Sequence, residues 1–501
     1  MRCYLGIDIG TFESKGVLVA EDGSILASAA RPHKMLVPEP GWAEHRPVEH
    51  WWNGFTELSQ RLIAEARVAP KDIRAVGASA IGPCMLPVDA DGAPLMNGVL
   101  YGVDTRAAKE IEELTTQIGA DRILEVSGNA LTSQSVGPKI LWLKRARPDL
   151  YAKARQFLTS TSYLVHRLTG AYVIDHYTAS GTSPLYDPAA LAYTDAFAAG
   201  ITPLDRLPEP RWTTDVVGGV TAAAAVETGL LAGTPVIAGT VDAAAEALSV
   251  GVLAPGDMML MYGSTIFIIE ITAERVQDAR LWYAPWLFPG QHAAMSGLAT
   301  SGTLTHWFRE HFARDLEPSV AVGELLAEAA ASPPGARGLV LLPYFSGERT
   351  PIHDPHARGV LFGLDLTHGR GDVYRALLEG NGHATRHILD TYAEIGVPPT
   401  TIYAVGGGTK NAVWSGATSD ISGRPQVVRE KTIGAAYGDA FLAALGVGDV
   451  HREAITDWNP VARTIHPDPS HVDVYGRAHG IFRALYPRTR DLMRAVSTEG
   501  Q

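Results

Sequence analysis

The stretch YLGIDIGTFESKGVLVAEDG, residues 4–23, decides how this chain begins to fold. LGIDI and KGVLVA are apolar runs rich in β-forming residues, and the glycine and hydroxyl residues of GTFES separate them. The pattern predicts a β-hairpin. Asp8 places one carboxylate near the end of the first, mostly apolar strand, beside the turn that begins with Gly10 and Thr11. That charge is either tolerated at a strand end or belongs to a binding site.

A second stretch repeats this arrangement near the middle of the chain. DMMLMYGSTIFIIEI, residues 257–271, has two apolar runs joined by a Gly-Ser-Thr turn. Helical spacing of apolar residues predicts helices at 49–67, 105–118, 138–146 and 161–168, and a long helix follows from residue 373. The duplication predicts two related α/β domains, and related domains commonly bind ligands between them.

Composition limits the class of protein. The chain has 501 residues, of which 46% are hydrophobic, so two or more domains with large cores are expected. A net charge of -12 argues against nucleic acid as the main partner. Two cysteines, Cys3 and Cys84, form no disulfide framework or zinc pattern, and no uncharged apolar run reaches the ~18 residues of a membrane span. We expect a cytoplasmic protein with neither a nucleic-acid nor a membrane partner.

The two predicted turns offer chemistry that suits phosphate. Backbone N–H groups and hydroxyls in a tight turn form a small concavity for phosphate oxygens, and a nearby carboxylate suits Mg2+. The first turn would use Asp8 for the metal and Gly10, Thr11, Ser14 and Lys15 for phosphate. The second would use the turn residues Gly263, Ser264 and Thr265. Two ordinary hairpins would show the same residues.

Two further segments carry candidate functional residues. In AVGGGTKN an apolar strand ends in Gly406, Gly407 and Gly408, and a helix begins near Lys410 or Asn411. Three glycines let a flat ring approach the backbone, although a flexible strand-to-helix turn would look alike. In VIAGTVDAAAEALSVG, Asp242 heads an alanine-rich helix. It is either a helix N-cap or a general base.

Taken together, these segments resemble the FGGY carbohydrate kinases of the actin-like ATPase superfamily. The resemblance covers nearly the whole chain in eight segments that follow the family's order: GIDIGTFESKGVLV, EPGWAEHRPVEHWW, PKILWLKRARPDLY, GTVDAAAEALSVG, MYGSTIFI, GVLFGLDLTHGRGDVYRALLEG, AVGGGTKNAVWSGATSDISGRPQVV and EKTIGAAYGDAFLAALGVG. In the sixth, Leu377 stands where a smaller or β-branched residue is usual. No single segment is decisive.

The resemblance implies two actin-like (ribonuclease H-like) domains that face each other across a cleft. Residues 1–246 would form the N-terminal domain, with the sugar site and the first phosphate hairpin. Residues 247–455 would form the nucleotide-binding domain, and 456–501 a helical tail. Ser301 and Gly302 lie where the family places part of its nucleotide cleft. Homodimers are common in the family, which leaves a homodimer open.

The resemblance also implies a mechanism with ATP and Mg2+. The adenosine of ATP would rest on Gly406, Gly407, Gly408 and Asn411. Its phosphates would lie between the Thr11, Ser14, Lys15 group and the Gly263, Ser264, Thr265 group. Asp8 would position Mg2+, directly or through water. Asp242 would accept the proton of a substrate hydroxyl as that hydroxyl attacks the γ-phosphoryl group in line.

The predicted sugar pocket departs from the xylulokinase branch that the chain otherwise resembles. Xylulokinases usually carry Gln-Met-His-Gly where this chain has Ile81, Gly82, Pro83 and Cys84. Tyr101, Asp104 and Arg106 match the family's next pocket element, with one extra residue between the aromatic and acidic members. The expected acceptor is a ketopentose such as D-xylulose. Another pentulose, a pentitol, or a role as a non-catalytic sugar sensor stays open.

Overall fold

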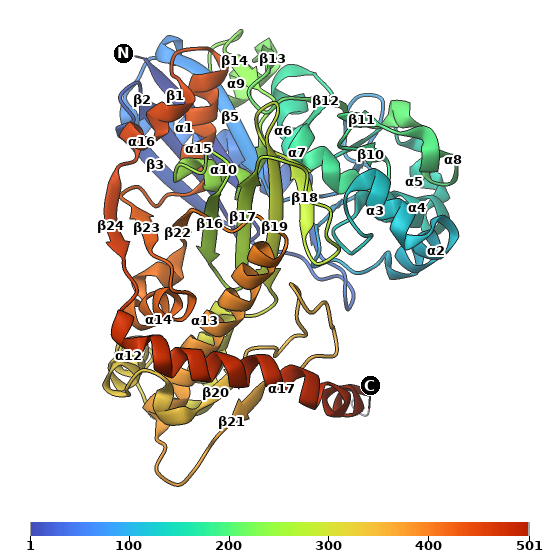
Figure 1. Cartoon of the computed structure of the whole chain (residues 1–501). Helices are drawn as coiled ribbons and strands as arrows, with labels where there is room; N and C mark the ends of the chain where they lie inside the picture. The colour runs from blue at the N-terminus through green and yellow to red at the C-terminus, as the bar shows by residue number, and fades with distance from the viewer. Residues whose placement is uncertain (1, 499–501) are drawn as a thin grey trace. The chain divides into compact units, whose positions relative to one another are not determined.

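The computed structural model describes residues 2–498, and the chain divides into two compact units (Figure 1). Unit 1 comprises Met1–Leu253, Thr272–Ala293 and Ile433–Asn459. Unit 2 comprises Ala254–Ile271, Ala294–Thr432 and Pro460–Gln501. The chain first passes from unit 1 to unit 2 between residues 253 and 254, and the segment Ile433–Asn459 returns to unit 1. The predicted domain boundaries at 246 and 455 do not include this return of the chain to unit 1.

Unit 1 is built on a seven-stranded sheet with the order β13-β14-β5-β1-β2-β3, in which β15 also pairs with β5. Its strands are β1 (Cys3–Ile9), β2 (Glu13–Ala20), β3 (Ile25–Pro32), β5 (Ile73–Ala80), β13 (Val216–Gly219), β14 (Pro235–Ile237) and β15 (Thr240–Val241). β1 and β15 both run parallel to β5. The carboxyl ends of these three strands therefore share one edge, the usual ligand edge of an α/β sheet. Gly10, Ile81 and Asp242 follow at that edge.

Helices of unit 1 confirm the periodicity predictions within a few residues. The predicted helix 49–67 begins as a π-helical turn, Pro47–Trp52, and continues as α1 (Asn53–Ala66). The other helices that matter here are α2 (Ala108–Ile118), α4 (Val136–Ala146), α6 (Ser160–Thr169), α10 (Asp242–Ser249) and α15 (Ala435–Gly446). The hydrophobic core of the unit lies between the sheet and α1, with Ile7, Ile9 and Leu58 fully or almost fully buried.

α15 packs directly against β1 and β5 on the opposite face of the sheet from α1 (Figure 1). Alternation along β1 puts Gly6 and Asp8 on the α15 face and Ile7 on the α1 face. A Cβ at Gly77 would lie 2.2 Å from the carbonyl oxygen of Asp439. Only glycine permits this approach, and the approach places α15 over the strand ends that carry Asp8.

Unit 2 repeats the sheet-and-hairpin plan. Its strands run in the order β19-β17-β16-β22-β23-β24, with bounds His292–Leu298, Ile266–Thr272, Asp257–Tyr262, Thr401–Val405, Gln426–Arg429 and Val461–Ile465. The antiparallel pair β16 and β17 confirms the second predicted hairpin. Its main helices are α11 (Gly302–Phe312), α12 (Ala321–Ala331), α13 (Arg370–Glu394), α14 (Ala412–Ser422) and α17 (Val472–Thr498).

The contact between α15 and the sheet generates a stability prediction. Gly77→Ala should lower the free energy of unfolding by about 1–3 kcal/mol, because the added methyl group overlaps the α15 backbone. Gly200→Ala is the matched control, since a Cβ there meets nothing within 4 Å. Urea unfolding of both variants measures the difference. Equal stabilities of the two variants would contradict the close packing of α15.

Candidate active site

A row of polar side chains crosses the unit 1 sheet at its ligand edge. The register pairs Asp8 with Lys15 on β2 and with Ser79 on β5. The Ser79 hydroxyl lies 2.7 Å from Asp439 Oδ2 on α15 and 3.4 Å from Asp8 Oδ1. One hydroxyl proton serves only the closer carboxylate, so Asp8 is left without a strong donor. Asp439 Oδ1 is buried and has no hydrogen-bond partner within residues 2–498.

Four carboxylates share this region and shift one another's protonation. Burial, together with the negative charges of Asp242, Asp439 and Glu246, raises the pKa of Asp8 well above its usual value, and Lys15 opposes that rise. Burial raises the pKa of Asp242 to about 6. Burial and the charge of Asp242 raise the pKa of Glu246 to about 7. The excess of acidic groups over one lysine makes this a place where a cation would relieve repulsion.

Asp242 is the first residue of α10, directly after β15. Its Oδ1 accepts a 2.7 Å hydrogen bond from the backbone N–H of Ala243. The N-cap position belongs to Val241, so the predicted alternative of a helix N-cap is not what the structure shows. No hydrogen bond reaches the other carboxylate oxygen of Asp242 within residues 2–498. A partly buried carboxylate with a free acceptor oxygen and a raised pKa has the properties of a general base.

The first hairpin turn, residues 10–13, closes with a 3.0 Å hydrogen bond from Gly10 N–H to the carbonyl of Glu13. Thr11 Oγ1 lies 3.1 Å from the hydroxyl of Tyr101, so the structure brings a predicted phosphate residue and a predicted sugar residue together. Ser14 is separated from them. Its side chain is fully buried on the α1 face, where its hydroxyl lies 3.4 Å from His33 Nδ1. Lys15, the next residue, lies on the Asp8 face.

Tyr101 is held by a buried lysine that the sequence reasoning did not select. Lys139 Nζ on α4 donates hydrogen bonds to the carbonyls of Leu100 and Tyr101. Burial lowers the pKa of Lys139 to about 8. A lysine inside the apolar pattern VGPKILWL was the available signal. Lys139 fixes the backbone from which Tyr101 projects.

Asp104 and Arg106 form one buried cluster with residues of the segment EPGWAEHRPVEHWW. Arg106 Nη2 lies 2.7 Å from Asp104 Oδ2 and 2.9 Å from Glu44 Oε1, and the guanidinium lies 3.9 Å above the ring of Trp42. Asp104 also accepts a 2.7 Å hydrogen bond from the N–H of Ala43. The Asp104 carboxylate is therefore occupied by the chain itself. Arg106 Nη1 is buried without a partner in the described part of the chain, so it is the polar atom that this cluster still offers.

The segment that departs from the xylulokinase pattern turns its side chains inward. Ile81 is 1% exposed and belongs to the hydrophobic core, and Cys84 is fully buried. A Cβ at Gly82 would lie 2.5 Å from the side chain of Val241. Gly82 precedes Pro83 through a cis peptide bond. This stretch therefore presents backbone and hydrocarbon at the strand edge and lacks polar side chains.

In unit 2 the three glycines that follow β22 have different surroundings, so the need for glycine differs among them. A Cβ at Gly406 would lie 2.5 Å from the carbonyl oxygen of Tyr262, and one at Gly408 would lie 2.7 Å from the ring of Trp414. Packing alone therefore demands these two glycines. A Cβ at Gly407 meets nothing within 4 Å. Asn411 is the N-cap of α14, and its Oδ1 accepts a 2.9 Å hydrogen bond from Trp414 N–H. Gly407 is the exposed member of the triplet, the one beside open space.

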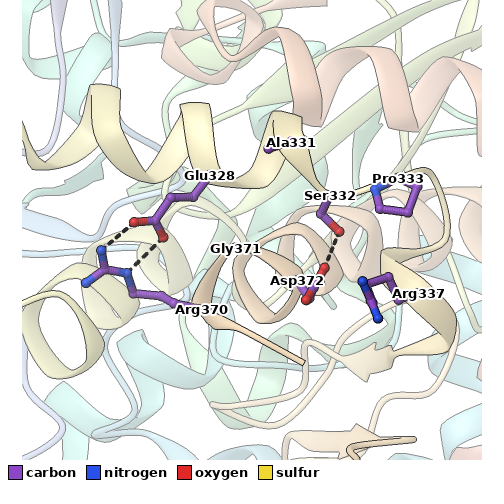
Figure 2. Close-up of a pocket in the computed structure, with 8 residues that line it drawn as sticks. All are labelled: Glu328, Ala331, Ser332, Pro333, Arg337, Arg370, Gly371 and Asp372. Atoms are coloured by element: carbon purple, nitrogen blue, oxygen red, sulfur yellow. Dashed lines mark hydrogen bonds and ion pairs between the residues drawn. The ribbon is translucent and has the colours of Figure 1, made fainter. Parts of the chain in front are cut away.

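A pocket of about 500 Å³ in unit 2 lies between α12 and the start of α13, where Arg370, Gly371 and Asp372 of the segment GVLFGLDLTHGRGDVYRALLEG line it (Figure 2). Figure 2 shows that its charged groups pair with one another: Arg370 with Glu328 at 2.8 Å, and Ser332 with Asp372 at 2.6 Å. Arg337 donates a 3.2 Å hydrogen bond to Thr367. The pairing joins α12 to α13, so the polar residues at the start of α13 have a structural role.

Comparison with known proteins identifies the family. Residues 3–249 match the N-terminal domain of the FGGY family of carbohydrate kinases, and residues 258–447 match its C-terminal domain. This chain belongs to the FGGY family of carbohydrate kinases. The family membership and the two-domain actin-like fold predicted from the sequence are thus confirmed, and the protein is a sugar kinase.

Several FGGY kinases match the chain over almost its whole length. A xylulose kinase of Bacillus subtilis (strain 168) is 29% identical over 99% of both chains. A xylulose kinase of Escherichia coli (strain K12) is 28% identical over 98% of this chain and 100% of its own. The crystal structure of a xylulose kinase from Rhodospirillum rubrum superposes with a TM-score of 0.91, at 33% identity, and covers 98% of this chain and 100% of that one.

Two features of this FGGY kinase concern metals and membranes. No group of three or more histidine, cysteine, aspartate or glutamate side chains within residues 2–498 is arranged to hold a metal ion by itself. A cation beside Asp8 would therefore need water or substrate oxygens as further ligands. In the same part of the chain, none of the helices combines the length and the apolar character needed to cross a membrane.

Asp439 and Glu246 are the acidic site residues that sequence reasoning missed in this kinase. Asp439 is a single charge in the apolar helix sequence AAYGDAFLAALG, and Glu246 follows Asp242 by one helical turn in DAAAEALS. Both signals were present locally. What was missing is the approach of α15 to β1 and β5, which brings a residue from the far end of the chain beside Asp8.

The three glycines generate a prediction about nucleotide binding. Gly407→Leu should raise the KM for ATP about tenfold or more, because the side chain fills the open space in which a flat ring would lie. Gly480→Leu on α17 is the matched control, since a Cβ there also meets nothing within 4 Å. Steady-state kinetics with ATP as the varied substrate measure the effect. An unchanged KM in the folded Gly407 variant would show that adenosine binds elsewhere.

Proposed function

We propose that this FGGY kinase uses ATP and Mg2+ to phosphorylate a hydroxyl of a small sugar or polyol, most favourably a ketopentose such as D-xylulose. The observation that carries the proposal is Asp242. It stands where β15 ends, on the strand edge shared with the hairpin turn 10–13, and it has a free acceptor oxygen. Those are the requirements of a base that takes a proton from an attacking hydroxyl.

Residues of unit 1 would serve the sugar and the phosphates. Thr11 and Lys15 would contact phosphate oxygens, while Tyr101 would contact substrate hydroxyls. Arg106 would do so only if the pocket opens toward its Nη1, because its side chain is fully buried. Ser14 would support the turn from below through His33 and would not contact phosphate itself, since its hydroxyl faces His33. In unit 2, Gly407 and Asn411 would contact adenosine, and Gly263, Ser264 and Thr265 would contact phosphate. The chemical step then depends on positioning and charge stabilisation.

The residues around Asp8 fit a magnesium ion. Carboxylate oxygens are its preferred protein ligands, and the mutual repulsion that raises the pKa of Asp8 would be relieved by a divalent charge. Asp8 would hold the ion, and Glu246 and Asp439 would add negative charge behind it. The bound ion would neutralise charge on the phosphate oxygens. Lys15 lies across the ladder from Asp8 and would do the same for an oxygen that the ion does not reach.

The acceptor is proposed from two opposing observations. Most of the similar proteins are called xylulose kinases, which favours D-xylulose, and one is called a ribulokinase. The stretch Ile81, Gly82, Pro83, Cys84 lacks the hydrogen-bonding side chains usual in xylulokinases, which favours another pentulose or a pentitol. A site that lacks a partner for one hydroxyl discriminates strongly against the sugar that needs it. A non-catalytic sugar sensor has less support, because Asp8 and Asp242 are both present.

A substrate panel tests the proposed function. D-xylulose, other ketopentoses, pentitols and glycerol are each incubated with ATP and Mg2+, and ADP release is measured. At least one pentose-sized acceptor should raise ADP release well above the background, and D-xylulose should rank among the best. Asp242→Asn should lower kcat by about 10²–10⁴-fold, since the base is lost while shape is kept.

The control for this panel is Asp215→Asn, at a half-buried residue of the same unit whose Oδ2 accepts a 3.0 Å hydrogen bond from the N–H of Trp212. It should keep full activity. The proposal fails when no acceptor raises ADP release or when Asp242→Asn stays fully active. Tight sugar binding without product would instead support a sensor.

The raised pKa of Asp242 predicts an acid limb in the pH profile. The base acts only when ionised, and burial raises its pKa to about 6. Therefore kcat/KM should fall roughly tenfold per unit as the pH drops below about 6, and should level off above about 7. An exposed aspartate would place that limb near pH 4. Measurement of kcat/KM between pH 5 and 8 decides, and a flat profile down to pH 5 would contradict the assignment of Asp242.

A further inference from the structure

Two histidine rings support the hairpin turn 10–13 from beneath. His33 Nε2 lies 3.0 Å from the carbonyl oxygen of Gly10, and His45 Nε2 lies 3.0 Å from the carbonyl oxygen of Thr11. A carbonyl oxygen only accepts hydrogen bonds, so both Nε2 atoms carry the proton. The backbone N–H of His33 also donates to the carbonyl of Phe12. Three consecutive carbonyls of the turn, those of Gly10, Thr11 and Phe12, are thereby held by His33 and His45.

Neighbouring groups fix the histidines in this form. His45 Nδ1 accepts a 3.1 Å hydrogen bond from Trp51 Nε1, which leaves Nε2 as its donor. His33 stacks on His50 with ring centres 5.3 Å apart, and His50 Nδ1 accepts from the N–H of Arg46. Burial and the neighbouring histidines lower the pKa of His45 to about 3. The rings are therefore neutral donors whose position is set by packing.

Anchored carbonyls determine where the amide N–H groups point. In a trans peptide the C=O and N–H bonds point in opposite directions, and the cis bonds of this chain lie elsewhere. With the carbonyls of Gly10 and Thr11 turned toward the histidines, the N–H groups of Thr11 and Phe12 turn away from them. Neither N–H has an acceptor within residues 2–498. Two adjacent free donors suit an anion.

In the turn 263–265 of unit 2, hydrogen bonds also hold the backbone carbonyls, but the donors are different. The carbonyl of Gly263 accepts from Gly302 N–H and from the Ser301 hydroxyl, both 3.1 Å away. The carbonyl of Ser264 accepts from Ser301 N–H and from both donors of Thr303. The N–H groups of Ser264 and Thr265 have no acceptor in the described part of the chain. Unit 2 obtains this from the start of α11, whereas in unit 1 histidine side chains hold the carbonyls of Gly10 and Thr11.

We propose that His33 and His45 are positioning residues for the nucleotide phosphates, because they hold the turn 10–13 with the N–H groups of Thr11 and Phe12 directed at phosphate oxygens. The proposal rests on the proposed function, which places the phosphates at this turn. Neither histidine touches the nucleotide. Each acts through one carbonyl, so a side chain that donates from the same place should replace it.

The test compares leucine and glutamine variants. His33→Leu and His45→Leu remove the donor, whereas His33→Gln and His45→Gln keep an N–H near the position of Nε2. Affinities for ADP with Mg2+ and for adenosine are measured by calorimetry. Each leucine variant should bind ADP about 10- to 100-fold more weakly, as expected for lost hydrogen bonds to a charged group. Adenosine affinity should stay within about twofold, and each glutamine variant should bind ADP within about threefold of wild type.

The matched control is His166→Leu, another half-buried histidine of unit 1, whose ring stacks on Tyr172. It should lose stability and keep the ratio of ADP to adenosine affinity. His33 is only half-buried, so its leucine variant keeps the test available when His45→Leu does not fold.

The outcomes separate this inference from the proposed function. Folded leucine variants that bind ADP like wild type would overturn the inference, as would glutamine variants that lose as much as leucine variants. Wild-type protein that binds ADP and phosphorylates no acceptor would overturn the proposed function alone. Wild-type protein that binds no ADP would overturn both.

Discussion

Burial of Asp8 under α15 is the constraint on which unit 1 depends. An ionised carboxylate in a close-packed interior is costly unless it is paired. Here the helix brings a second carboxylate, Asp439, and the glycine contact at Gly77 leaves no room for it to move away. The Ser79 hydroxyl satisfies only one of the two acids. The fold therefore loses part of its stability by holding acidic groups together at one place, which the proposed cation would offset and a purely structural hairpin would not need.

The two hairpin turns solve a single geometric problem in different ways. To bind phosphate as proposed, each must keep amide N–H groups unpaired and directed outward, although unpaired N–H groups favour any nearby acceptor. Holding the carbonyls on the inner side fixes the peptide planes, so the donors stay available without strain. In unit 2 the holding atoms are mainly the backbone N–H groups of Ser301, Gly302 and Thr303, which only a proline substitution would remove. In unit 1 they are imidazoles, which makes that turn sensitive to substitutions in a segment remote in sequence.

Most elements were predictable because their signals are local. The hairpins, the strand before Gly406 and the helix after Asp242 follow from apolar runs, turn residues and helical periodicity. Alternation in β2 could also have shown that Ser14 and Lys15 face opposite sides of the sheet, so that both cannot contact one phosphate. Asp439 and the histidine anchors were not predictable in the same way. Their roles arise only when α15 and the segment around His45 fold back onto β1, and no local pattern specifies that contact.

The sugar pocket shows how the departure from the xylulokinase pattern acts. Because Ile81 and Cys84 turn into the core, this stretch offers peptide groups and hydrocarbon, and in the proposed function hydroxyl recognition would shift to the side of Tyr101 and Arg106. There Lys139 fixes the backbone of Tyr101, and the Trp42 ring with two carboxylates leaves Arg106 one free nitrogen. Such a pocket would form hydrogen bonds to the substrate hydroxyls from one side only. In the proposed function it would place the tightest demand on the hydroxyls near Asp242 and a looser one on the rest of the acceptor.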